Sequence, residues 1–507
     1  MRFGLRDWAE RQPDRVAVVT NGLATRYGQL EETANRAARL FRSRGLKPGD
    51  HIAAVVMNDP VIFALVWAAY RAGLYFTPIS SAASLRDVAY VVENSTAALV
   101  IVDARLLELV KLPGVTATRP QWFSARGNLD GFLPFETALA AEPSSPLHDE
   151  RPGNLMMYTS GTTGAPKGVW RPLPTEASGP PPFARDLLSI FDIEADSRYL
   201  STAPLYHAAA LRFCLAFTAA GAAVHVMTKF DPAAALDMLE RERITHSQWV
   251  PTMFRRLLTL PAERRAAFAA PDHRIALHGA APCPVPLKRT MIEWWGPIIQ
   301  EYYSGSEGVG LSAISSREWL RKPGSVGRCL KGQVHVLDED WNELPTGSPG
   351  QLFFSGVAPF QYFNEPVKTK ERTSPQGYQT FGDIGFCDDD GYIFLTDRLD
   401  DMIISGGVNI YPQEIEAALL NSEAVEDCAV VGVPDEDLGE RAVAFVVLRD
   451  RKGDAGSAAR SLDEHCLRAL GRIKRPREFH FVDDLTRSPT GKLLRRELKR
   501  SLASKSQ

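Results

Sequence analysis

The spacing of apolar residues in the first part of the chain predicts strands that alternate with helices. Residues 16–20, 52–57 and 97–102 are short apolar runs rich in β-branched side chains, as is typical of buried strands. Residues 27–44 and 60–72 are longer and carry an apolar stripe with helical spacing. This alternation predicts parallel sheets whose strands are joined by crossover helices.

The same alternation resumes beyond residue 220 and then gives way to a different pattern. Strands are expected at residues 222–227 and 247–250, and helices at residues 232–243 and 252–260. From about Gly332 the chain has short segments of alternating polarity, separated by Gly, Pro and Asp, at residues 333–337, 351–355 and 391–396. Such segments predict a small antiparallel barrel or sandwich.

The residues after Asp400 predict a separate α+β domain. Its expected elements are a hairpin, a helix at residues 412–420 and strands at residues 429–433 and 442–448. A second helix is expected to open at Ser461, with Glu464 as its capping-box partner. Residues 1–399 and 400–507 are therefore predicted to form a large α/β domain and a small α+β domain.

Length and composition place the chain among globular proteins with several domains. Its 507 residues correspond to about three domains of typical size. Hydrophobic residues make up 45% and charged residues 23%, which excludes a disordered or collagen-like chain. The 58 Lys and Arg residues nearly balance the 61 Asp and Glu residues, so the net charge of −3 argues against a nucleic-acid partner.

The cysteines and the apolar segments predict a cytoplasmic protein without a membrane span. The six cysteines are far apart and include no CxxC pair, so we expect free thiols in a reducing compartment rather than a zinc site. The N-terminal residues are rich in charge and lack the apolar core of a signal peptide. The most apolar stretch, residues 61–70, is too short to cross a bilayer.

Residues 158–169, with the sequence YTSGTTGAPKGV, carry the strongest chemical signal in the chain. The three glycines let the backbone turn tightly, the four hydroxyl side chains add hydrogen-bond donors, and Lys167 adds a positive charge. Together these residues predict a cradle for phosphate oxygens, whereas most Gly- and Ser-rich segments are flexible surface loops. Pro166 before Lys167 and Gly168 after it exclude a Walker A loop.

At this motif the chain resembles the adenylate-forming superfamily, which contains acyl-CoA synthetases, peptide-synthetase adenylation domains and firefly-type luciferases. The segment is a highly specific signature of that superfamily. Further family motifs follow in the expected order along the chain: PLYH at 204–207, GAAP at 279–282, YSGSE at 303–307, GD at 382–383, DRLDD at 397–401, SGGVN at 405–409 and PTGK at 489–492. The resemblance implies a small, mobile C-terminal domain with a hinge at Asp400.

The resemblance implies an acyl-CoA synthetase that uses ATP, Mg²⁺ and CoA. A carboxylic acid and ATP would give acyl-AMP and pyrophosphate, and the CoA thiolate would then give the thioester and AMP. The closest rival loads the acyl group onto a carrier-protein thiol, and a third hypothesis is a nucleotide-binding regulator without chemistry. Residues 208–213 contain no Asp that could pair with an amino-acid ammonium group, which disfavours amino-acid activation.

The motifs assign candidate roles in the first half-reaction. Lys492 matches the catalytic lysine, which neutralises charge between the attacking carboxylate and the α-phosphate. Glu307 matches the magnesium ligand, and a lone carboxylate suits Mg²⁺, which keeps most of its waters. Asp383 and Arg398 match residues that contact the ribose. The other nucleotide candidates are Thr159 (also a metal candidate), Ser160, Gly161, Thr162, Thr163 and Lys167 at the phosphates, and Gly279, Ala280, Ala281, Tyr303 and Ser306 near the base.

Other family positions concern the acyl group, CoA and the rotation of the C-terminal domain. Candidates for the acyl pocket are His207, which is also a candidate catalytic residue, with Ala208, His278, Gly305 and Gly308. A buried histidine that bonds to the backbone is the alternative interpretation of His207. Ser405, Gly406 and Gly407 would approach the pantetheine arm of CoA after a rotation about Asp400.

Small residues in the candidate pocket favour a bulky apolar acyl group over acetate. We expect a medium- or long-chain fatty acid first and a polycyclic or aryl acid second. Departures from the family pattern at Ser306, His278, Trp170 and Arg171 concern the lining of the pocket rather than the chemistry. The expected partners are small molecules, and the oligomeric state stays open, with a homodimer among the possibilities.

Overall fold

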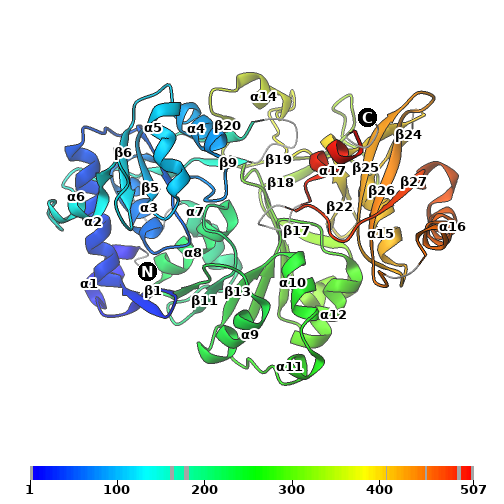
Figure 1. Ribbon diagram of the computed structural model, residues 1–507, viewed down its shortest axis with the longest axis horizontal. Helices are drawn as coiled ribbons and strands as arrows, with labels where there is room; N and C mark the ends of the chain where they lie inside the picture. The colour runs from blue at the N-terminus through cyan, green and yellow to red at the C-terminus, as the bar shows by residue number, and fades with distance from the viewer. Residues whose placement is uncertain are drawn as a thin grey trace. The chain divides into compact units, whose positions relative to one another are not determined.

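The computed structural model describes residues 4–159, 165–175, 182–406, 408–451, 454–487 and 493–503. The chain divides into two compact units, whose helices and strands are labelled in Figure 1. Unit 1 consists of Met1–Trp249, Leu257–Leu277 and Pro359–Thr369, and unit 2 consists of Val250–Arg256, His278–Ala358 and Lys370–Gln507. The mixed α/β fold confirms the predicted class. The domain boundary expected at Asp400 falls within unit 2 and stays a prediction.

Unit 1 contains a six-stranded sheet in which every neighbouring pair is parallel. In spatial order its strands are β7 (Leu133–Pro134), β6 (Gln121–Ala125), β5 (Ala97–Asp103), β3 (His51–Val55), β4 (Tyr75–Pro78) and β8 (Asn154–Leu155). The crossover helices are α3 (Val61–Arg71), between β3 and β4, which was expected at residues 60–72, and α4 (Leu85–Asn94), between β4 and β5, which was not predicted. The central strand β3 is buried along its whole length, which explains its continuous apolar sequence.

Two further groups of strands belong to unit 1. The first runs β13 (His246–Trp249), β11 (Arg198–Ser201), β12 (Ala223–Val226), β1 (Val16–Thr20) and β2 (Leu23–Arg26). It is parallel except for β2, which turns back along β1. The second is a small antiparallel sheet of β20 (Gln361–Tyr362), β10 (Lys167–Trp170) and β9 (Met157–Thr159). This small sheet holds the two flanks of the predicted phosphate loop.

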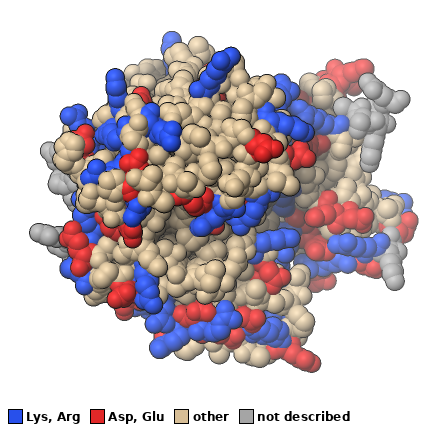
Figure 2. Space-filling view, turned by 60° about the vertical axis from the view of Figure 1, so that its left-hand side comes forward, with Lys and Arg blue, Asp and Glu red and all other residues tan. Residues whose placement is uncertain are grey.

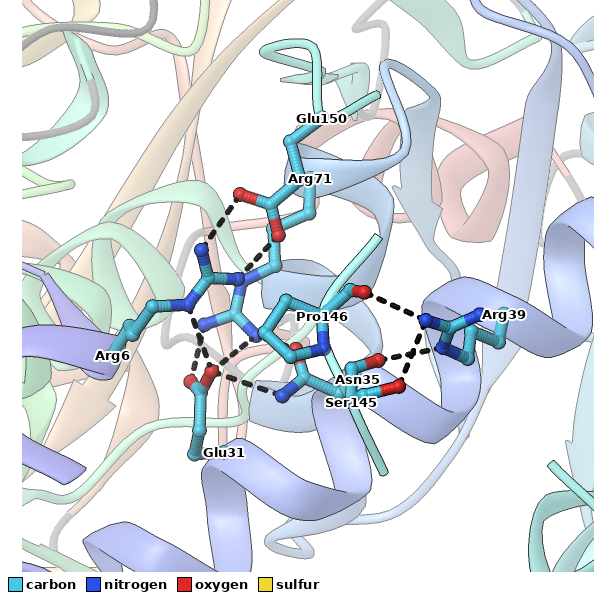
Figure 3. A network of polar contacts seen from close by, with 8 residues as sticks. All are labelled: Arg6, Glu31, Asn35, Arg39, Arg71, Ser145, Pro146 and Glu150. Carbon is cyan, nitrogen blue, oxygen red and sulfur yellow. Dashed lines mark hydrogen bonds and ion pairs between the residues drawn. The ribbon is translucent and has the colours of Figure 1, made fainter. Parts of the chain in front are cut away.

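A charged network in unit 1 joins α1 (Leu5–Arg11), α2 (Tyr27–Ser43) and α3 to the segment that precedes β8 (Figure 3). The Arg71 side chain, which is 7% exposed, donates to both carboxylate oxygens of Glu31 and to Oδ1 of Asn35. Arg6 donates to Glu31 at 3.3 Å and to Glu150 at 3.1 Å. Two guanidinium groups and two carboxylates therefore neutralise one another inside unit 1.

Unit 2 contains a run of strands in which every neighbouring pair is antiparallel. In spatial order they are β18 (Gln333–Leu337), β19 (Gly350–Ser355), β21 (Asp383–Cys387), β22 (Ile393–Arg398), β17 (Ser325–Lys331), β16 (Leu311–Ile314) and β15 (Ile299–Tyr303). This run confirms the antiparallel region expected beyond Gly332. The register of β21 and β22 places Asp383 directly opposite Arg398.

The C-terminal part of unit 2 has its own sheet and core. Its strands are β24 (Val408–Ile410), β23 (Ile403–Ser405), β26 (Gly439–Leu448) and β25 (Val425–Asp435), with β27 (Glu478–Phe481) parallel to β26. The β23–β24 hairpin and α15 (Pro412–Leu420) agree with the sequence prediction. Apolar side chains cover both faces of the sheet, with α15 and α16 (Ala455–Lys474) packed on one face and α17 (Arg495–Ala503) on the other.

The predicted start of the last long helix is wrong. Helix α16 begins at Ala455, and the carboxylate of Asp454 caps it by accepting from the backbone N–H of Ser457. Ser461 and Glu464, which were expected to form a capping box, lie inside the helix. Asp454 satisfies the first free N–H groups earlier in the chain, so a second cap at Ser461 is not needed.

The chain forms the following further elements. The helices are η1 (Leu107–Lys111), α5 (Leu112–Val115), α6 (Phe135–Ala140), α7 (Pro182–Ile190), α8 (Ala208–Ala220), α9 (Pro232–Arg241), α10 (Pro251–Leu258), α11 (Ala262–Ala266), α12 (Val285–Trp295), α13 (Ser316–Arg321), α14 (Pro366–Glu371) and η2 (Leu399–Asp401), and one further strand is β14 (Ile275–His278).

The mixed surface charge and the free cysteines are in keeping with the near-zero net charge and the cysteine spacing of the sequence. The face drawn in Figure 2 carries both basic and acidic side chains, interspersed among uncharged ones. All six cysteines lie in described stretches and are free thiols, as expected from their spacing. Within the described part of the chain, none of the helices has the length and apolar character needed to cross a membrane.

Candidate active site

The predicted phosphate loop joins two paired strands of unit 1. Thr159 at the end of β9 lies opposite Lys167 at the start of β10. The ammonium group of Lys167 lies 5.2 Å from the centre of the Tyr362 ring, which supports the lysine stem at the edge of the sheet. Ser160, Gly161, Thr162 and Thr163 lie outside the described residues. The strand pairing brings the two ends of the loop together, as a compact phosphate cradle requires.

Tyr158 anchors the first flank of this loop. Its hydroxyl donates to Oδ1 of Asn94 at 2.6 Å, and burial raises the pKa of the phenol, which therefore stays protonated. The ring lies across Gly168 of the facing strand, where a Cβ would come within 3.0 Å of the ring carbons. A glycine is therefore needed at this position of the motif for packing as well as for turning the chain.

Three predicted nucleotide residues meet in unit 2. The hydroxyl of Tyr303, at the end of β15, donates to Oδ2 of Asp383 at 2.7 Å. Nε of Arg398 lies 3.2 Å from Oδ1 of the same carboxylate, and this charge raises the pKa of the guanidinium. A carboxylate has about four acceptor positions, so Asp383 can still accept hydrogen bonds from sugar hydroxyls. The three side chains come from separate strands, and their roles toward the nucleotide stay predictions.

Glu307 lies beside this cluster and is buried, with 9% of its surface exposed. Its negative charge contributes to raising the pKa values of both Arg398 and Tyr303, so it belongs to the same electrostatic group. A Cβ on Gly305 would lie 2.5 Å from the Phe381 ring and 2.9 Å from Oε2 of Glu307. Gly305 therefore lets the backbone pass between an aromatic ring and the candidate metal ligand.

The motifs did not single out Phe381 among the residues around the site. Its ring meets the Tyr303 ring edge-on at a centroid distance of 5.4 Å. Phe381 comes directly before Gly382 and Asp383, so an aromatic residue at the start of the GD motif was the signal that could have identified it. Burial and the charge of Asp383 raise the pKa of Tyr303 well above its ordinary value, which keeps the phenol a donor.

The predicted base-lining loop has a strained backbone. Ala280 has a φ of 68°, in the left-handed region that non-glycine residues rarely occupy. Gly279 lies so close to β15 that a Cβ would be 2.7 Å from the carbonyl oxygen of Tyr302. Gly308 also has a positive φ, of 58°, and its backbone N–H bonds to the carbonyl oxygen of Gly305 at 3.0 Å. Both loops therefore contain backbone conformations that restrict which residues fit there.

The candidate acyl-pocket histidines are both uncharged at neutral pH. Burial lowers the pKa of His207 to about 4, and its Nε2 has no hydrogen-bond partner among the described residues. His207 occupies the N-cap position of α8, whose first residue is Ala208, but its side chain makes no capping hydrogen bond. Burial, together with the charge of Lys288, lowers the pKa of His278, which is fully buried at the end of β14. A neutral imidazole with a free ring nitrogen can bind a polar group of a ligand.

The C-terminal candidates are described in part. Ser405 is buried at the end of β23, and Gly406 has a φ of 56° in the hairpin turn. Asp400 lies in η2, between β22 and β23. Gly407 and Lys492 lie outside the described residues.

Two arginines on either side of the PTGK motif bind acidic residues of unit 2. Arg487 binds both oxygens of Asp427, at 2.9 and 3.1 Å. Arg495 binds Glu416 at 2.6 Å and Asp401 at 3.2 Å. Arg487 and Leu493 form an antiparallel backbone bridge.

The carboxylates of unit 2 fit a magnesium ion. The described part of the chain contains no group of three or more His, Cys, Asp or Glu side chains suited to holding a metal. Mg²⁺ is commonly bound through one or two carboxylates together with substrate phosphates and waters, so it does not need such a cage. Glu307 supplies a buried carboxylate of this kind. When bound, the ion would neutralise charge on the phosphates of ATP.

Comparisons with known proteins agree with these features. The family model described as "AMP-binding enzyme" matches residues 5–362, and the model described as "AMP-binding enzyme C-terminal domain" matches residues 414–492. The chain belongs to this family, the adenylate-forming superfamily, and is an AMP-forming acid–thiol ligase that uses ATP, Mg²⁺ and CoA. The sequence prediction of the superfamily and of the enzyme class is thereby confirmed.

The relatives cover almost the whole chain. "Long-chain-fatty-acid--CoA ligase FadD13" of Mycobacterium tuberculosis is 30% identical over 479 residues, which cover 93% of this chain and 92% of the relative. "Feruloyl-CoA synthase" of an Amycolatopsis species is 32% identical over 517 residues, which cover 98% and 99%. The solved structure of the ATP-bound RpMatB-BxBclM chimera B3 has a TM-score of 0.86 at 26% identity and covers 100% of both chains. These proteins differ in acyl group, so the relatives define the reaction but not the acid.

Proposed function

We propose that this acyl-CoA ligase activates a medium- or long-chain, or otherwise bulky and apolar, carboxylic acid through acyl-AMP. The supporting sequence feature is the row of small residues that begins α8 directly after His207, namely Ala208, Ala209 and Ala210. Small side chains there leave volume for an apolar chain. Residues 208–213 contain no Asp or Glu that would repel the carboxylate of the substrate. The names of the two relatives, a long-chain fatty acid ligase and a feruloyl-CoA synthase, are in keeping with such an acid.

The cluster of Tyr303, Asp383 and Arg398 beside Glu307 is the observation that carries the nucleotide half of the proposal. Asp383 would accept hydrogen bonds from the ribose hydroxyls, with Arg398 and Tyr303 holding its carboxylate in place. Glu307 would bind Mg²⁺ and thereby help to neutralise the phosphates as pyrophosphate leaves. The Tyr303 ring, fixed by its hydrogen bond and by Phe381, would stack on the adenine.

The remaining residues would act on the phosphates and on the acid. Lys167 and the hydroxyls that follow Tyr158 would bind the β- and γ-phosphates. The neutral His207 imidazole would donate its free N–H to a carboxylate oxygen of the acid and so orient the attack on the α-phosphate. Lys492 would neutralise the charge that develops between the carboxylate and that phosphate.

The substrate is tested by measuring AMP release with ATP and Mg²⁺ for a panel of acids, with and without CoA. The panel should contain acetate, palmitate, benzoate, a bile acid and several amino acids. We expect CoA-dependent AMP release with an apolar acid and little with acetate. Selective use of acetate would contradict the proposed acyl class. Pyrophosphate release that CoA does not accelerate would favour the alternative, an enzyme that loads a carrier-protein thiol.

The role of Lys492 is tested by separating the two half-reactions. Lys492→Ala should lose acyl-AMP formation but still convert supplied acyl-AMP and CoA to the thioester. Equal loss of both steps would contradict the assignment. Arg496→Ala, which removes a neighbouring charge outside the motif, is the matched control and should keep both steps.

The role of Asp400 is tested with the same two assays. If Asp400 is the hinge, Asp400→Pro should form acyl-AMP but fail at thioester formation, because proline fixes φ where the rotation needs it to change. Full turnover by this variant would mean that the chain rotates elsewhere or does not rotate.

A further inference from the structure

A fully buried ion pair lies next to the base-lining loop of unit 2. Nζ of Lys288, on α12, is 2.6 Å from Oε2 of Glu301, on β15, and the two side chains are 0% and 9% exposed. The same carboxylate oxygen lies 3.6 Å from Nε2 of His278. The ammonium group also lies 4.8 Å from the centre of the Trp319 ring. One carboxylate therefore gathers a lysine and a histidine out of contact with water.

These residues lie at the two ends of the loop and on the strand beneath it. His278 directly precedes Gly279, where the loop leaves β14, and Lys288 lies in the first turn of α12, where the loop ends. Glu301 is two residues before Tyr303, so the two side chains point to the same face of β15. Glu301 thus connects both ends of the loop to the strand that carries the candidate adenine-stacking tyrosine.

The loop needs such support because its conformation is unfavourable on its own. A left-handed residue such as Ala280 costs roughly 1–2 kcal/mol when it is not glycine. Strained residues of this kind persist where the surrounding structure leaves no alternative. The close approach of Gly279 to the carbonyl oxygen of Tyr302 fixes only the start of the loop. The Lys288–Glu301 pair fixes its end.

Stability alone does not explain the ion pair. Buried charges lose their hydration, and well-packed apolar residues of similar volume are often as stable or more stable. Burial raises the pKa of Glu301 even with Lys288 beside it, which shows the cost of holding this charge inside. Neither ring nitrogen of His278 has a hydrogen-bond partner among the described residues. A role in the geometry of the loop gives this costly arrangement a function.

We propose that Lys288, Glu301 and His278 are positioning residues that hold the loop of residues 279–282 in its adenine-binding conformation. They would thereby set the affinity and selectivity for the adenine nucleotide without contacting it. This inference rests on the proposed function, because it takes the loop and Tyr303 to bind the base. It adds three residues that the motifs did not assign to nucleotide recognition.

The test compares two ligands that each correspond to one part of ATP: AMP, which contains the base, and tripolyphosphate, which contains only the phosphate chain. Wild-type protein, Glu301→Gln and the double variant Lys288→Met with Glu301→Leu would be titrated with AMP and with tripolyphosphate in a calorimeter. Both variants lose the charge-assisted hydrogen bond between Lys288 and Glu301. If that bond holds the loop in its binding conformation, AMP should bind about tenfold more weakly, which corresponds to the free energy of one such bond. Tripolyphosphate lacks the base and should bind all three proteins equally.

The double variant separates positioning from stability. Glu301→Gln leaves Lys288 buried without its counter-ion and should unfold at lower urea concentration, whereas the apolar pair should recover that stability. If the triad positions the loop, the double variant stays weak toward AMP although it is stable. Recovery of both stability and AMP affinity would overturn the inference and leave the pair a structural one.

Selectivity and a conservative variant complete the test. The ratio of kcat/KM for ATP to that for GTP should fall in both variants, and Lys288→Arg, which keeps the charge, should retain AMP affinity within about threefold. Glu31→Gln, which breaks the buried network of unit 1, is the matched control and should lose stability but no selectivity. An unchanged ATP-to-GTP ratio would contradict the inference. If wild-type protein bound no AMP, the proposed function itself would fail.

Discussion

Each unit of the molecule contains a cluster of charged side chains, and the two clusters differ in the residues that they join. In unit 1, Arg6 and Arg71 face Glu31 and Glu150, so two positive charges meet two negative charges (Figure 3). In unit 2, Nε of Arg398 lies 3.2 Å from Oδ1 of Asp383, and the charges of Asp383 and Glu307 both raise the pKa of Arg398. The first cluster is neutral and joins helices to a connecting segment. The second consists of residues that the motifs relate to the ribose and to Mg²⁺.

The comparison teaches how to separate structural from functional charge. A buried ion pair that is neutral and hydrogen-bonded on all sides needs nothing further, and removing one partner mainly costs stability. A carboxylate with unused acceptor positions, such as Asp383, can in addition accept hydrogen bonds from a ligand. The family model covers both units, so membership in the family does not by itself show which cluster takes part in the reaction.

The largest expected effect is on the stability of unit 1. Glu31→Gln leaves Arg71 and Arg6 without their shared counter-ion and should lower the free energy of unfolding by about 3–5 kcal/mol. Urea denaturation measures this loss. Protein that remains folded should keep the KM for ATP of the wild type, and a changed KM would show that this network also serves nucleotide binding.

The next largest effect is on catalysis in unit 2. Glu307→Gln removes the proposed Mg²⁺ ligand and should lower the rate of acyl-AMP formation by about 10²–10³-fold, as is typical when one stabilising group is lost from a transition state. Stability should change little, because Gln keeps the shape of the side chain. The acid-dependent exchange of pyrophosphate into ATP measures the step, and a rate within threefold of wild type would exclude Glu307 as the ligand.

A smaller effect is expected where the ribose is bound. Asp383→Asn keeps one acceptor oxygen but loses the charge that holds Arg398, so the KM for ATP should rise about tenfold to a hundredfold. The KM for the acid should stay the same, because the substitution acts on the nucleotide alone. Steady-state kinetics with ATP and the acid varied in turn measures both KM values. Equal increases in the KM for ATP and the KM for the acid would contradict this prediction.

Acid should destabilise the parallel part of unit 1 through its buried histidines. Burial lowers the pKa of His246 to about 4, below the usual 6.5 of an unfolded chain. The unfolded state then binds the proton first, so the stability from this residue is full above about pH 6.5 and is lost as the pH falls toward 4. Between pH 7 and pH 5.5 the loss is about 1 kcal/mol for His246. Urea denaturation of wild type and His246→Gln at both pH values measures this loss. If both proteins lose the same stability between pH 7 and pH 5.5, the loss does not come from His246.

The smallest effect is expected at an exposed ion pair, which serves as the baseline. On α16, Nη1 of Arg468 lies 3.9 Å from Oε2 of Glu464, and the two side chains are 70% and 71% exposed. Arg468→Ala should change the free energy of unfolding by less than about 0.5 kcal/mol, because water and salt screen such pairs. A loss comparable to that of Glu31→Gln would remove the contrast between buried and exposed charge.

The sequence predicted the elements well where local patterns decide them. The strand at Val16–Thr20 and the helix at Pro412–Leu420 have the bounds that their apolar spacing and flanking residues indicated. The start of α16 was wrong because Ser461 and Glu464 imitate a cap, whereas Asp454 provides the real one. Strand β25 extends beyond the predicted residues 429–433 because its long pairing with β26 supplies partners that the apolar run alone does not reveal.

The site was predictable where a motif is contiguous and unpredictable where contacts join distant segments. Asp383 and Arg398 came from short motifs, and their approach follows from the register of two strands. The Lys288–Glu301 pair was missed because no spacing rule relates a helix residue to a strand residue 13 positions away. Phe381 was missed because its contact with Tyr303 depends on the folding of segments far apart in the chain.

The most direct test of the contrast is the magnesium dependence of ATP binding, measured by calorimetry. Wild-type protein and Glu31→Gln should bind ATP more tightly as Mg²⁺ is added, because both keep Glu307, the proposed Mg²⁺ ligand. Glu307→Gln should lose most of this dependence. A Glu307→Gln protein whose ATP affinity still rises with Mg²⁺ as in the wild type would contradict the account.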